Sequence, residues 1–259
     1  MRFALLQYPI VWADKAANLG LLHDRLEQIA GKADVAVLPE MFSTGFCTDR
    51  PDLAEPWGGD TCCRLQAMAD SFHIAIAGSM ICVEGNRLFN RGFLFRPSQS
   101  PLYQNKRHLY RRSGEDRFFH AGEEQMVWEY QGVRMRMLVC YDLRFPVWAR
   151  QPRERRDMYD VLLCVANWPQ VRIQYWDAML ASRATENQCY IVAVNPVGDD
   201  GMGLHYNGHS VAYDTRLVDL AAFRDDEEGT RIVELDMQVL QHFRDASPLW
   251  KDADQFELK

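Results

Sequence analysis

Segments with the period of a β-strand alternate with segments that have the period of an α-helix along the first 100 residues. The first helical segment carries Leu19, Leu22, Leu26 and Ile29 on one face, which predicts a helix with one buried side. The strand segments are nearly continuous apolar runs, as expected of strands covered on both faces of a sheet. We predict strands over 3–7, 35–38, 74–82 and 88–95, helices over 15–30 and 61–73, and a turn at 84–87 that joins the last two strands.

The same alternation continues to the C-terminus. We predict strands over 133–139, 161–166 and 190–195, a helix over 170–187, a loop over 199–203, and shorter strands over 210–213, 217–222 and 230–235. No interdomain linker, repeat or low-complexity tract interrupts the pattern. A chain of 259 residues is long enough for one large layered domain, so the fold class is α/β with a single domain.

Composition restricts the kinds of partner. The formal net charge of −7 argues against broad binding to nucleic acid or to an anionic membrane, and a small molecule fits better. The apolar run at the N-terminus is too short for a signal peptide, and no stretch approaches the roughly 18 apolar residues of a membrane span. The seven cysteines are odd in number and irregularly spaced. We therefore expect a cytoplasmic protein with reduced thiols.

Cys140 follows a strand and precedes a predicted helix. Residues 133–139 alternate between apolar and other side chains, while Asp142 is suited to cap the helix and Pro146 to lie in its first turn. A strand-to-helix junction lifts a side chain out of the sheet and exposes backbone N–H groups, and a helix N-terminus favours a thiolate. Cys140 is thus a candidate nucleophile, although a buried cysteine is more often a small apolar residue.

Two other charged residues also follow predicted strands, where α/β sheets tend to place their sites. Glu40 comes directly after the strand over 35–38 and has apolar neighbours, which suits a base, although a solvated carboxylate is the commoner outcome. Lys106 follows a short strand that ends at residue 105, and its ammonium would stabilise a thiolate or an oxyanion if it faced Cys140. Glu115 lies in a polar loop, where a carboxylate needs no special explanation.

Other mechanisms have less support. His108, His120, His205 and His209 lack the spacing of a zinc site, and none lies beside Cys140 in sequence. A distant Cys–His pair is compatible with the sequence but has no positive support. The glycines over 198–203 do not form a phosphate-binding strand-to-helix motif, which argues against a nucleotide-dependent enzyme.

Glu40, Lys106 and Cys140, each at a strand end, resemble the Glu-Lys-Cys triad of the nitrilase superfamily of carbon–nitrogen hydrolases. The resemblance extends to the segments around them and covers nearly the whole chain. The combination of residues 39–46 with residues 140–146 is most similar to the omega-amidase branch. The matching segments are Leu38-Pro39-Glu40-Met41-Phe42, Lys106-Arg107-His108-Leu109, Cys140-Tyr141-Asp142-Leu143-Arg144-Phe145-Pro146, Ala166-Asn167-Trp168-Pro169 and Arg183-Ala184-Thr185-Glu186-Asn187.

The resemblance implies an α-β-β-α sandwich, a homodimer or higher homo-oligomer, and neither metal nor organic cofactor. Many members of the superfamily have a second active-site glutamate between the lysine and the cysteine. Glu115 is the best candidate, and Glu123 and Glu124 lie in the same loop. The C-terminal segment, about 240–259, is a candidate oligomer contact.

The mechanism that follows is cysteine-dependent hydrolysis of the terminal amide of 2-oxo dicarboxylic monoamides, such as 2-oxoglutaramate and 2-oxosuccinamate. Glu40 is the expected base and acid, Cys140 the nucleophile, and Lys106 with the Tyr141 backbone N–H the oxyanion ligands. Phe46, Arg144 and Trp168 are expected to shape the substrate pocket, with Arg144 as the candidate partner of a substrate carboxylate. The structural alternatives are an ion pair for Arg144 and a core position for Trp168.

Two alternatives stay open. The same triad serves other amidases, carbamoylases and nitrilases, because specificity depends on loops and pocket shape rather than on the triad. A non-catalytic binding or scaffold protein could keep the fold, but retention of all three triad residues speaks against this reading.

Overall fold

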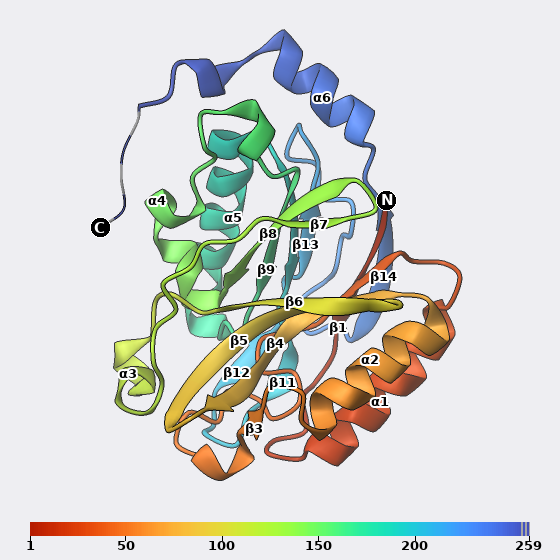
Figure 1. The fold of residues 1–259 in the computed structure, drawn as a ribbon, viewed down its shortest axis with the longest axis vertical. Helices are drawn as coiled ribbons and strands as arrows, with labels where there is room; N and C mark the ends of the chain where they lie inside the picture. The colour runs from red at the N-terminus through yellow and green to blue at the C-terminus, as the bar shows by residue number, and fades with distance from the viewer. Residues whose placement is uncertain (255, 257, 259) are drawn as a thin grey trace.

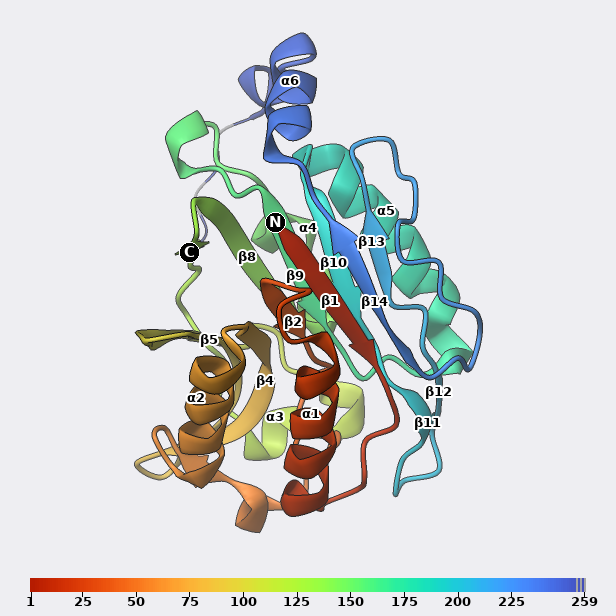
Figure 2. The ribbon, with the colours of Figure 1, turned by 90° about the vertical axis from the view of Figure 1, so that its right-hand side faces the viewer.

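The computed structural model describes residues 1–254, 256 and 258. Two β-sheets lie face to face, with α1 and α2 packed outside one sheet and α5 packed outside the other (Figures 1 and 2). The predicted α-β-β-α sandwich is therefore confirmed. The helices are α1 (Lys15–Ile29), α2 (Asp60–Phe72), α3 (Glu115–Phe118), α4 (Pro146–Ala149), α5 (Ile173–Asn187) and α6 (Met237–Ala246), with short 3-10 helices η1 (Pro51–Leu53), η2 (Arg111–Ser113), η3 (Cys140–Arg144), η4 (Arg155–Asp157), η5 (Gln170–Arg172) and η6 (Leu249–Lys251).

The first sheet has the order β14-β1-β2-β4-β5-β6, and β3 also pairs with β4. β1, β2 and β4 are parallel, whereas β14, β5 and β6 join antiparallel to their neighbours. The turn predicted at 84–87 does connect β4 to β5. Its strands are β1 (Arg2–Gln7), β2 (Val35–Val37), β3 (Glu55–Pro56), β4 (Ala75–Glu84), β5 (Arg87–Arg96), β6 (Gln99–Asn105) and β14 (Gly229–Glu234).

The second sheet has the order β13-β10-β9-β8-β7, in which β8, β9 and β10 are parallel. A separate two-stranded hairpin, β11–β12, follows β10 in sequence. The strands are β7 (Trp128–Tyr130), β8 (Val133–Val139), β9 (Val161–Val165), β10 (Tyr190–Val194), β13 (Val211–Tyr213), β11 (Val197–Asp199) and β12 (His205–Asn207).

Side-chain alternation along β1 divides the core between the layers. Phe3 and Leu5 belong to the cluster between the two sheets, whereas Ala4 and Leu6 belong to the cluster beneath α1 and α2. All four side chains are fully buried, which explains why the strand reads as a continuous apolar run. Burying apolar surface on both faces contributes roughly 1.5–3 kcal/mol per large side chain.

The strand predicted over 217–222 is wrong. The region contains a single bridge between Tyr213 and Asp219 instead of a ladder. Its aspartates capture nearby backbone donors: Asp214 accepts from Arg216 and Val218, and Asp219 accepts from the two residues that follow Leu220. Such local side-chain bonds compete with strand pairing. The apolar residues over 217–222 therefore lie in a turn and not in a strand.

Parallel strands of both sheets end at the same edge of the sandwich. β2 leads to Glu40, β8 to Cys140 and β9 to Asn167. The Glu40 N–H donates to the Ala166 carbonyl at 3.3 Å, and the Asn167 side-chain amide donates to the Glu40 carbonyl at 2.7 Å. These bonds connect the two sheets at their carboxyl ends. None of the helices within the described residues is long and apolar enough to span a membrane.

Candidate active site

Cys140 occupies a sharp turn at the end of β8. Its φ of +48° is in the left-handed region, which is uncommon and strained for a residue with a side chain. The side chain is 9% exposed, and its Sγ lies 3.9 Å from the Asn167 carbonyl oxygen. The predicted strand-to-turn junction is present, but the expected helix is only the five-residue η3 followed by the four-residue α4. A helix macrodipole therefore gives little help to a thiolate.

Asp142 caps η3 from its third residue, as expected for the helix that follows β8, and it does not cap α4, whose N-cap residue is Phe145. One carboxyl oxygen accepts from the Val139 N–H at 3.1 Å, and the other accepts from the His108 N–H at 2.8 Å. The His108 ring also contacts this carboxyl at 2.9 Å and stacks on Phe145 at 3.7 Å. Asp142 thus connects the Cys140 turn to the segment that follows Lys106. Its bond to the Val139 N–H is the capping bond of η3.

Glu40 is fully buried and accepts hydrogen bonds at both carboxyl oxygens. Oε1 accepts from the Lys106 ammonium at 2.9 Å and from the Asn90 amide at 2.7 Å, while Oε2 accepts from the Asn167 backbone N–H at 2.9 Å. Buried carboxylates require such partners. The solvated carboxylate considered from the sequence is therefore excluded.

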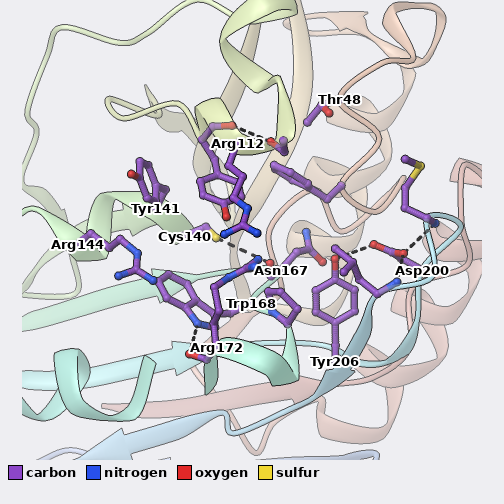
Figure 3. A pocket seen from close by; sticks show the side chains of 16 residues that line it. Thr48, Arg112, Cys140, Tyr141, Arg144, Asn167, Trp168, Arg172, Asp200 and Tyr206 are labelled. Atoms are coloured by element: carbon purple, nitrogen blue, oxygen red, sulfur yellow. Dashed lines mark hydrogen bonds between the residues drawn. The ribbon is translucent and has the colours of Figure 1, made fainter. Parts of the chain in front are cut away.

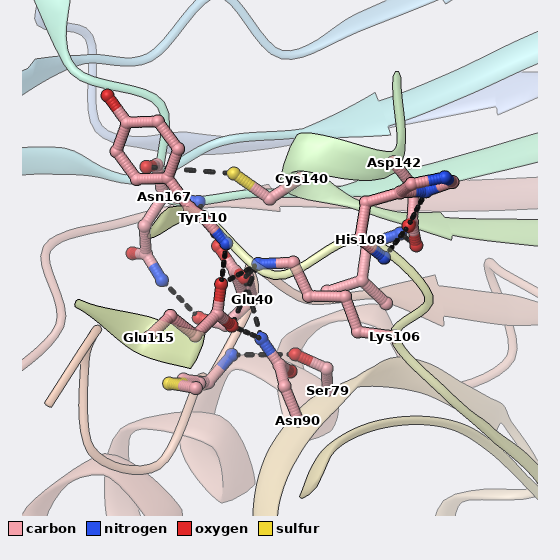
Figure 4. Close-up of polar contacts among 12 residues, drawn as sticks. Glu40, Ser79, Asn90, Lys106, His108, Tyr110, Glu115, Cys140, Asp142 and Asn167 are labelled. Carbon is pink, nitrogen blue, oxygen red and sulfur yellow. Dashed lines mark hydrogen bonds and ion pairs between the residues drawn. The ribbon is translucent and has the colours of Figure 1, made fainter. Parts of the chain in front are cut away.

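Lys106 and Glu115 form the other half of the same cluster (Figure 4). The Lys106 Nζ lies 3.0 and 2.9 Å from the two carboxyl oxygens of Glu115, and both side chains are fully buried. Glu115 also accepts from the Tyr110 backbone N–H at 2.6 Å. The position of Glu115 as the first residue of α3, rather than in an open polar loop, directs its carboxyl inward. Glu123 and Glu124 are exposed, so Glu115 is the glutamate that contacts Lys106.

The charges in this cluster shift one another's titration. Burial alone would lower the pKa of Lys106, but the carboxylates of Glu115 and Glu40 outweigh it and raise that pKa. Burial, assisted by the Glu40 charge, raises the pKa of Glu115 against the opposing effect of Lys106. Burial and the Glu40 charge raise the pKa of Cys140 well above its ordinary value, although Lys106 acts in the opposite direction. The resting sulfur is therefore a thiol that needs a base.

Two buried amides complete the cluster and were not identified as site residues from the sequence. Asn90 contacts both glutamates, at 2.7 Å to Glu40 and 3.4 Å to Glu115. Asn167 uses its backbone N–H and its side chain to hold Glu40. The only sequence signal for Asn90 was a polar residue within the apolar strand over 88–95, and Asn167 lay within a matching segment without an assigned role.

A cavity of about 390 Å³ opens onto Cys140 (Figure 3). This volume is in the usual range for sites that take small molecules. Its lining comes from four loops and from the tip of the β11–β12 hairpin. The three predicted pocket residues, Phe46, Arg144 and Trp168, all line it. The complete lining is Phe46, Thr48, Tyr110, Arg112, Ser113, Cys140, Tyr141, Arg144, Asn167, Trp168, Pro169, Arg172, Asp200, Met202, Leu204 and Tyr206.

The predicted pocket residues have distinct positions. The Phe46 ring lies 5.4 Å from the Lys106 Nζ, between the buried cluster and the cavity. Trp168 is buried, and its indole N–H donates to the Arg172 carbonyl at 2.8 Å. The Arg144 guanidinium lies over the Trp168 ring at 5.0 Å. Tyr141 follows Cys140 within η3, where the first N–H groups have no partner within the helix.

Positive charge dominates the cavity wall, although the chain as a whole carries a formal net charge of −7. Arg112, Arg144 and Arg172 line the cavity, against the single carboxylate of Asp200. Asp200 is already engaged: it accepts from the Tyr206 hydroxyl at 2.8 Å and from two backbone N–H groups of its own hairpin. The cavity is thus suited to a small anion.

A metal centre would need a cluster of suitable ligands. Within residues 1–254, 256 and 258, no group of three or more His, Cys, Asp or Glu side chains is placed to hold a metal ion. The histidines noted in the sequence have other partners: His209, for example, contacts Asp177 and Asp225 at 3.1 and 2.9 Å.

Known proteins resemble this chain over its full length. Omega-amidase YafV of Escherichia coli K12 is 40% identical, with 100% of this chain and 98% of the relative covered. The 2-oxoglutaramate amidase of Bacillus subtilis is 30% identical, with 95% of each covered. A crystal structure of a CN-hydrolase superfamily protein from Xanthomonas campestris, which has an arsenic adduct in its active site, superposes with a TM-score of 0.96 at 35% identity, covering 100% of this chain and 99% of the other.

The family profile described as carbon-nitrogen hydrolase matches residues 2–245. This span contains Glu40, Lys106, Glu115 and Cys140, as well as every residue that lines the cavity. The superfamily resemblance drawn from the strand-end residues is therefore confirmed. The chain belongs to the carbon–nitrogen hydrolase family of the nitrilase superfamily and is an omega-amidase-like enzyme.

Proposed function

We propose that this enzyme hydrolyses the terminal amide of 2-oxo dicarboxylic monoamides, such as 2-oxoglutaramate and 2-oxosuccinamate, through a thioester on Cys140. One observation carries the proposal: a cavity with three arginines and one engaged aspartate opens directly onto the thiol and its buried Glu-Lys-Glu cluster. An amide whose far end is a carboxylate matches both features. Similarity to an omega-amidase and to a 2-oxoglutaramate amidase supports the same substrate class.

Acylation begins with a thiol, because burial and Glu40 raise the pKa of Cys140. Glu40 takes the thiol proton as the sulfur attacks the amide carbonyl carbon. The developing oxyanion is stabilised by the Lys106 ammonium and the Tyr141 backbone N–H. Glu40 then returns the proton to the amide nitrogen, the carbon–nitrogen bond breaks, and ammonia leaves.

Deacylation uses the same groups, with water in place of the thiol as the nucleophile. Glu40 removes a proton from water as the water oxygen attacks the thioester carbonyl, and the oxyanion is held as before. The carbon–sulfur bond breaks, the thiolate recovers a proton from Glu40, and the free acid leaves. One carboxyl group thus carries the proton in both halves of the cycle.

Glu115 acts through Lys106 rather than on the substrate. Its carboxyl contacts the ammonium with both oxygens, which fixes the direction of the Lys106 side chain and raises its pKa. Glu115 is itself held by the Tyr110 N–H. We assign it as a positioning residue that keeps a charged ammonium beside the reacting carbon.

The cavity charge also predicts a preference for oxo over amino substrates. Glutamine and asparagine carry an ammonium in place of the oxo group, and three arginines repel it, while Asp200 already accepts three hydrogen bonds. Burying that cation without a free partner would cost several kcal/mol, so discrimination of roughly a hundredfold or more is expected.

The test is a comparison of kcat/KM for 2-oxoglutaramate, 2-oxosuccinamate, glutamine, asparagine and an aliphatic nitrile, measured by ammonia release. The proposal requires the two oxo substrates to lead, with Cys140→Ala inactive on all five. Equal oxo and amino values, or a preference for the nitrile, would replace the substrate class by that of another amidase, carbamoylase or nitrilase. Absence of turnover on every amide and nitrile would favour a non-catalytic role.

We also propose a homodimer that uses the C-terminal segment. Val239, Leu249, Phe256 and Leu258 are each about half exposed, and an exposed apolar row is typical of an interface. Residues 255, 257 and 259 of the predicted contact segment lie outside the described residues. Light scattering during gel filtration should give about twice the mass of the 30.0 kDa chain, and a mass that stays monomeric at high concentration would reject the proposal.

A further inference from the structure

The three arginines of the cavity differ in what already surrounds them. The Arg144 guanidinium lies between two aromatic faces, at 5.0 Å from the Trp168 ring and 5.2 Å from the Tyr175 ring. Such stacking satisfies part of a guanidinium's interactions and fixes its plane. Arg144 therefore forms part of the cavity wall, and it is less suited to bind the substrate carboxylate than the sequence predicted.

Arg172 reaches the cavity from the opposite side of the Trp168 indole. Its backbone is anchored, because its carbonyl accepts the indole N–H of Trp168 at 2.8 Å. Its guanidinium lies 5.5 Å from the Tyr110 ring and points into the cavity toward the region of Cys140 (Figure 3). Arg172 is also the N-cap residue of α5, whose first turn contains no acidic residue, so the helix terminus adds positive potential there.

Arg112 reaches the cavity from η2, and its guanidinium also points toward the region of Cys140 (Figure 3). The segment that carries it is tied to the buried cluster, because the Tyr110 N–H donates to Glu115 at 2.6 Å. The neighbouring Arg111 behaves differently: its side chain is 88% exposed and lies 3.8 Å from Asp116. Both arginines are exposed, but Arg112 lies on the cavity wall, whereas Arg111 lies beside Asp116 outside the cavity.

Neither Arg112 nor Arg172 has a carboxylate within 4.0 Å among the residues that the structure describes. Two cations that point into one cavity repel each other, and the repulsion is relieved when an anion lies between them. A carboxylate with two oxygens can accept from two guanidinium groups at once, in charge-assisted hydrogen bonds.

We propose that Arg112 and Arg172 together bind the carboxylate at the end of the substrate remote from the amide, and that Arg144 supports the wall instead. The inference rests on the proposed function, because it assigns the specificity of that same site. The arginine pair is the specificity determinant: it selects amides that carry an anionic end and orients the amide carbonyl toward Cys140.

The position of these contacts dictates their kinetic signature. A carboxylate several bonds from the reacting carbon keeps the same charge in the ground state and in the transition state. Loss of its partner therefore weakens the binding of both alike, which raises KM and changes kcat little. A residue needed only for the shape of the fold would reduce kcat for every substrate.

The experiment compares Arg112→Gln, Arg172→Gln and Arg144→Gln, with Arg111→Gln as the matched control from the same segment. Each is assayed on 2-oxoglutaramate and on its methyl ester, in which the carboxylate is neutral and the amide unchanged. The expected result for Arg112→Gln and Arg172→Gln is a loss of about tenfold to a hundredfold in kcat/KM for the acid, through KM, with less than about threefold change for the ester. Binding of glutarate to Cys140→Ala, measured by calorimetry, should weaken equally when either arginine is replaced.

The outcomes separate the two proposals. If Arg144→Gln shows the selective loss while the other two do not, or if all three variants lose acid and ester activity alike, the assignment of the pair is wrong. If the wild-type enzyme prefers the acid and keeps that preference in the Arg112→Gln, Arg172→Gln double variant, the pair is again wrong but the proposed function stands. If the wild-type enzyme does not prefer the acid over the ester, the proposed function fails, and the inference fails with it.

Discussion

Replacing Lys106 by Met removes the only cation that the buried glutamates contact within the described residues. The Lys106 Nζ lies 2.9 Å from Glu40 and 2.9 Å from the nearer oxygen of Glu115, and all three side chains are fully buried. Methionine is close to lysine in length, so the change creates little cavity. The variant leaves two carboxyl groups buried side by side without a positive partner.

The expected loss of stability can be worked from these contacts. Each ion pair at this distance is worth about 6 kcal/mol at an effective dielectric constant of about 20. Part of this loss is offset because lysine no longer has to be desolvated. Loss of one partner of a buried ion pair typically costs about 3–5 kcal/mol, which is a drop in Tm of roughly 6–20 °C for a domain of this size. Turnover should fall by at least about a hundredfold, because the oxyanion loses its cation.

The loss should depend on pH with a defined sign. Burial and Glu40 raise the pKa of Glu115 in the wild type, and removal of the ammonium raises it further. A folded-state pKa above the unfolded value of about 4.3 means that the folded state is favoured below about pH 4.3 and loses this advantage as pH rises through the folded-state pKa. The stability gap between variant and wild type should therefore be small in acid and widen toward neutral pH.

Thermal unfolding followed by circular dichroism measures the gap, and Lys106→Met with Glu115→Gln is the matched control. The double variant removes one of the two unpaired buried carboxylates, so it should regain much of the stability that the single variant lost, while staying inactive. A single variant as stable as the wild type at pH 7, or a double variant less stable than the single one, would show that the unpaired buried carboxylates do not cause the loss of stability.

The remaining predictions concern the proton carrier, the thiol and a close backbone contact. Glu40→Gln should slow both acylation and deacylation in single-turnover experiments, and a normal rate for either step would exclude the shared base. The pKa of Cys140 is raised well above its ordinary value, so inactivation by iodoacetamide should keep accelerating above about pH 9. The rate is measured in a Cys63→Ser background, which removes the exposed thiol. A plateau below about pH 7 would show a stabilised thiolate. Gly122→Ala should destabilise by about 1–3 kcal/mol or more and reduce kcat, since the new Cβ would lie 2.2 Å from the Asn105 carbonyl oxygen, beside Lys106; denaturant titration giving wild-type stability would contradict it.

The layered fold was predictable because the segments with a clear helix or strand period form those elements in the structure. The strand over 133–139 is found with the same bounds, and the helix predicted over 15–30 ends one residue earlier. The prediction of a strand over 217–222 was wrong because a run of apolar residues does not show that Asp214 and Asp219 bind the backbone of the turn. In such segments, local hydrogen bonds from side chains to the backbone determine the conformation, and hydrophobic periodicity alone does not predict these bonds.

The site was predictable where side chains follow strand ends and not where they depend on tertiary packing. Glu40 and Cys140 could be singled out because parallel strands carry both to one edge of the sandwich. The sequence could not place Asn90, which contacts both glutamates from within β5. It also could not predict that Asp142 binds the His108 N–H. It also could not distinguish Arg144 from Arg172, because their surroundings come from aromatic rings distant in sequence.

The proposed reaction passes through an acyl-enzyme on Cys140, which mass spectrometry can detect in enzyme quenched in acid during turnover of 2-oxoglutaramate. We expect the mass of the intact protein to increase by that of the 2-oxoglutaryl group. The adduct should be located on the peptide that contains Cys140, be removed by hydroxylamine, and be absent from Cys140→Ala. Ammonia release that proceeds with no adduct on Cys140 under these conditions, or with turnover intact in Cys140→Ala, would contradict it.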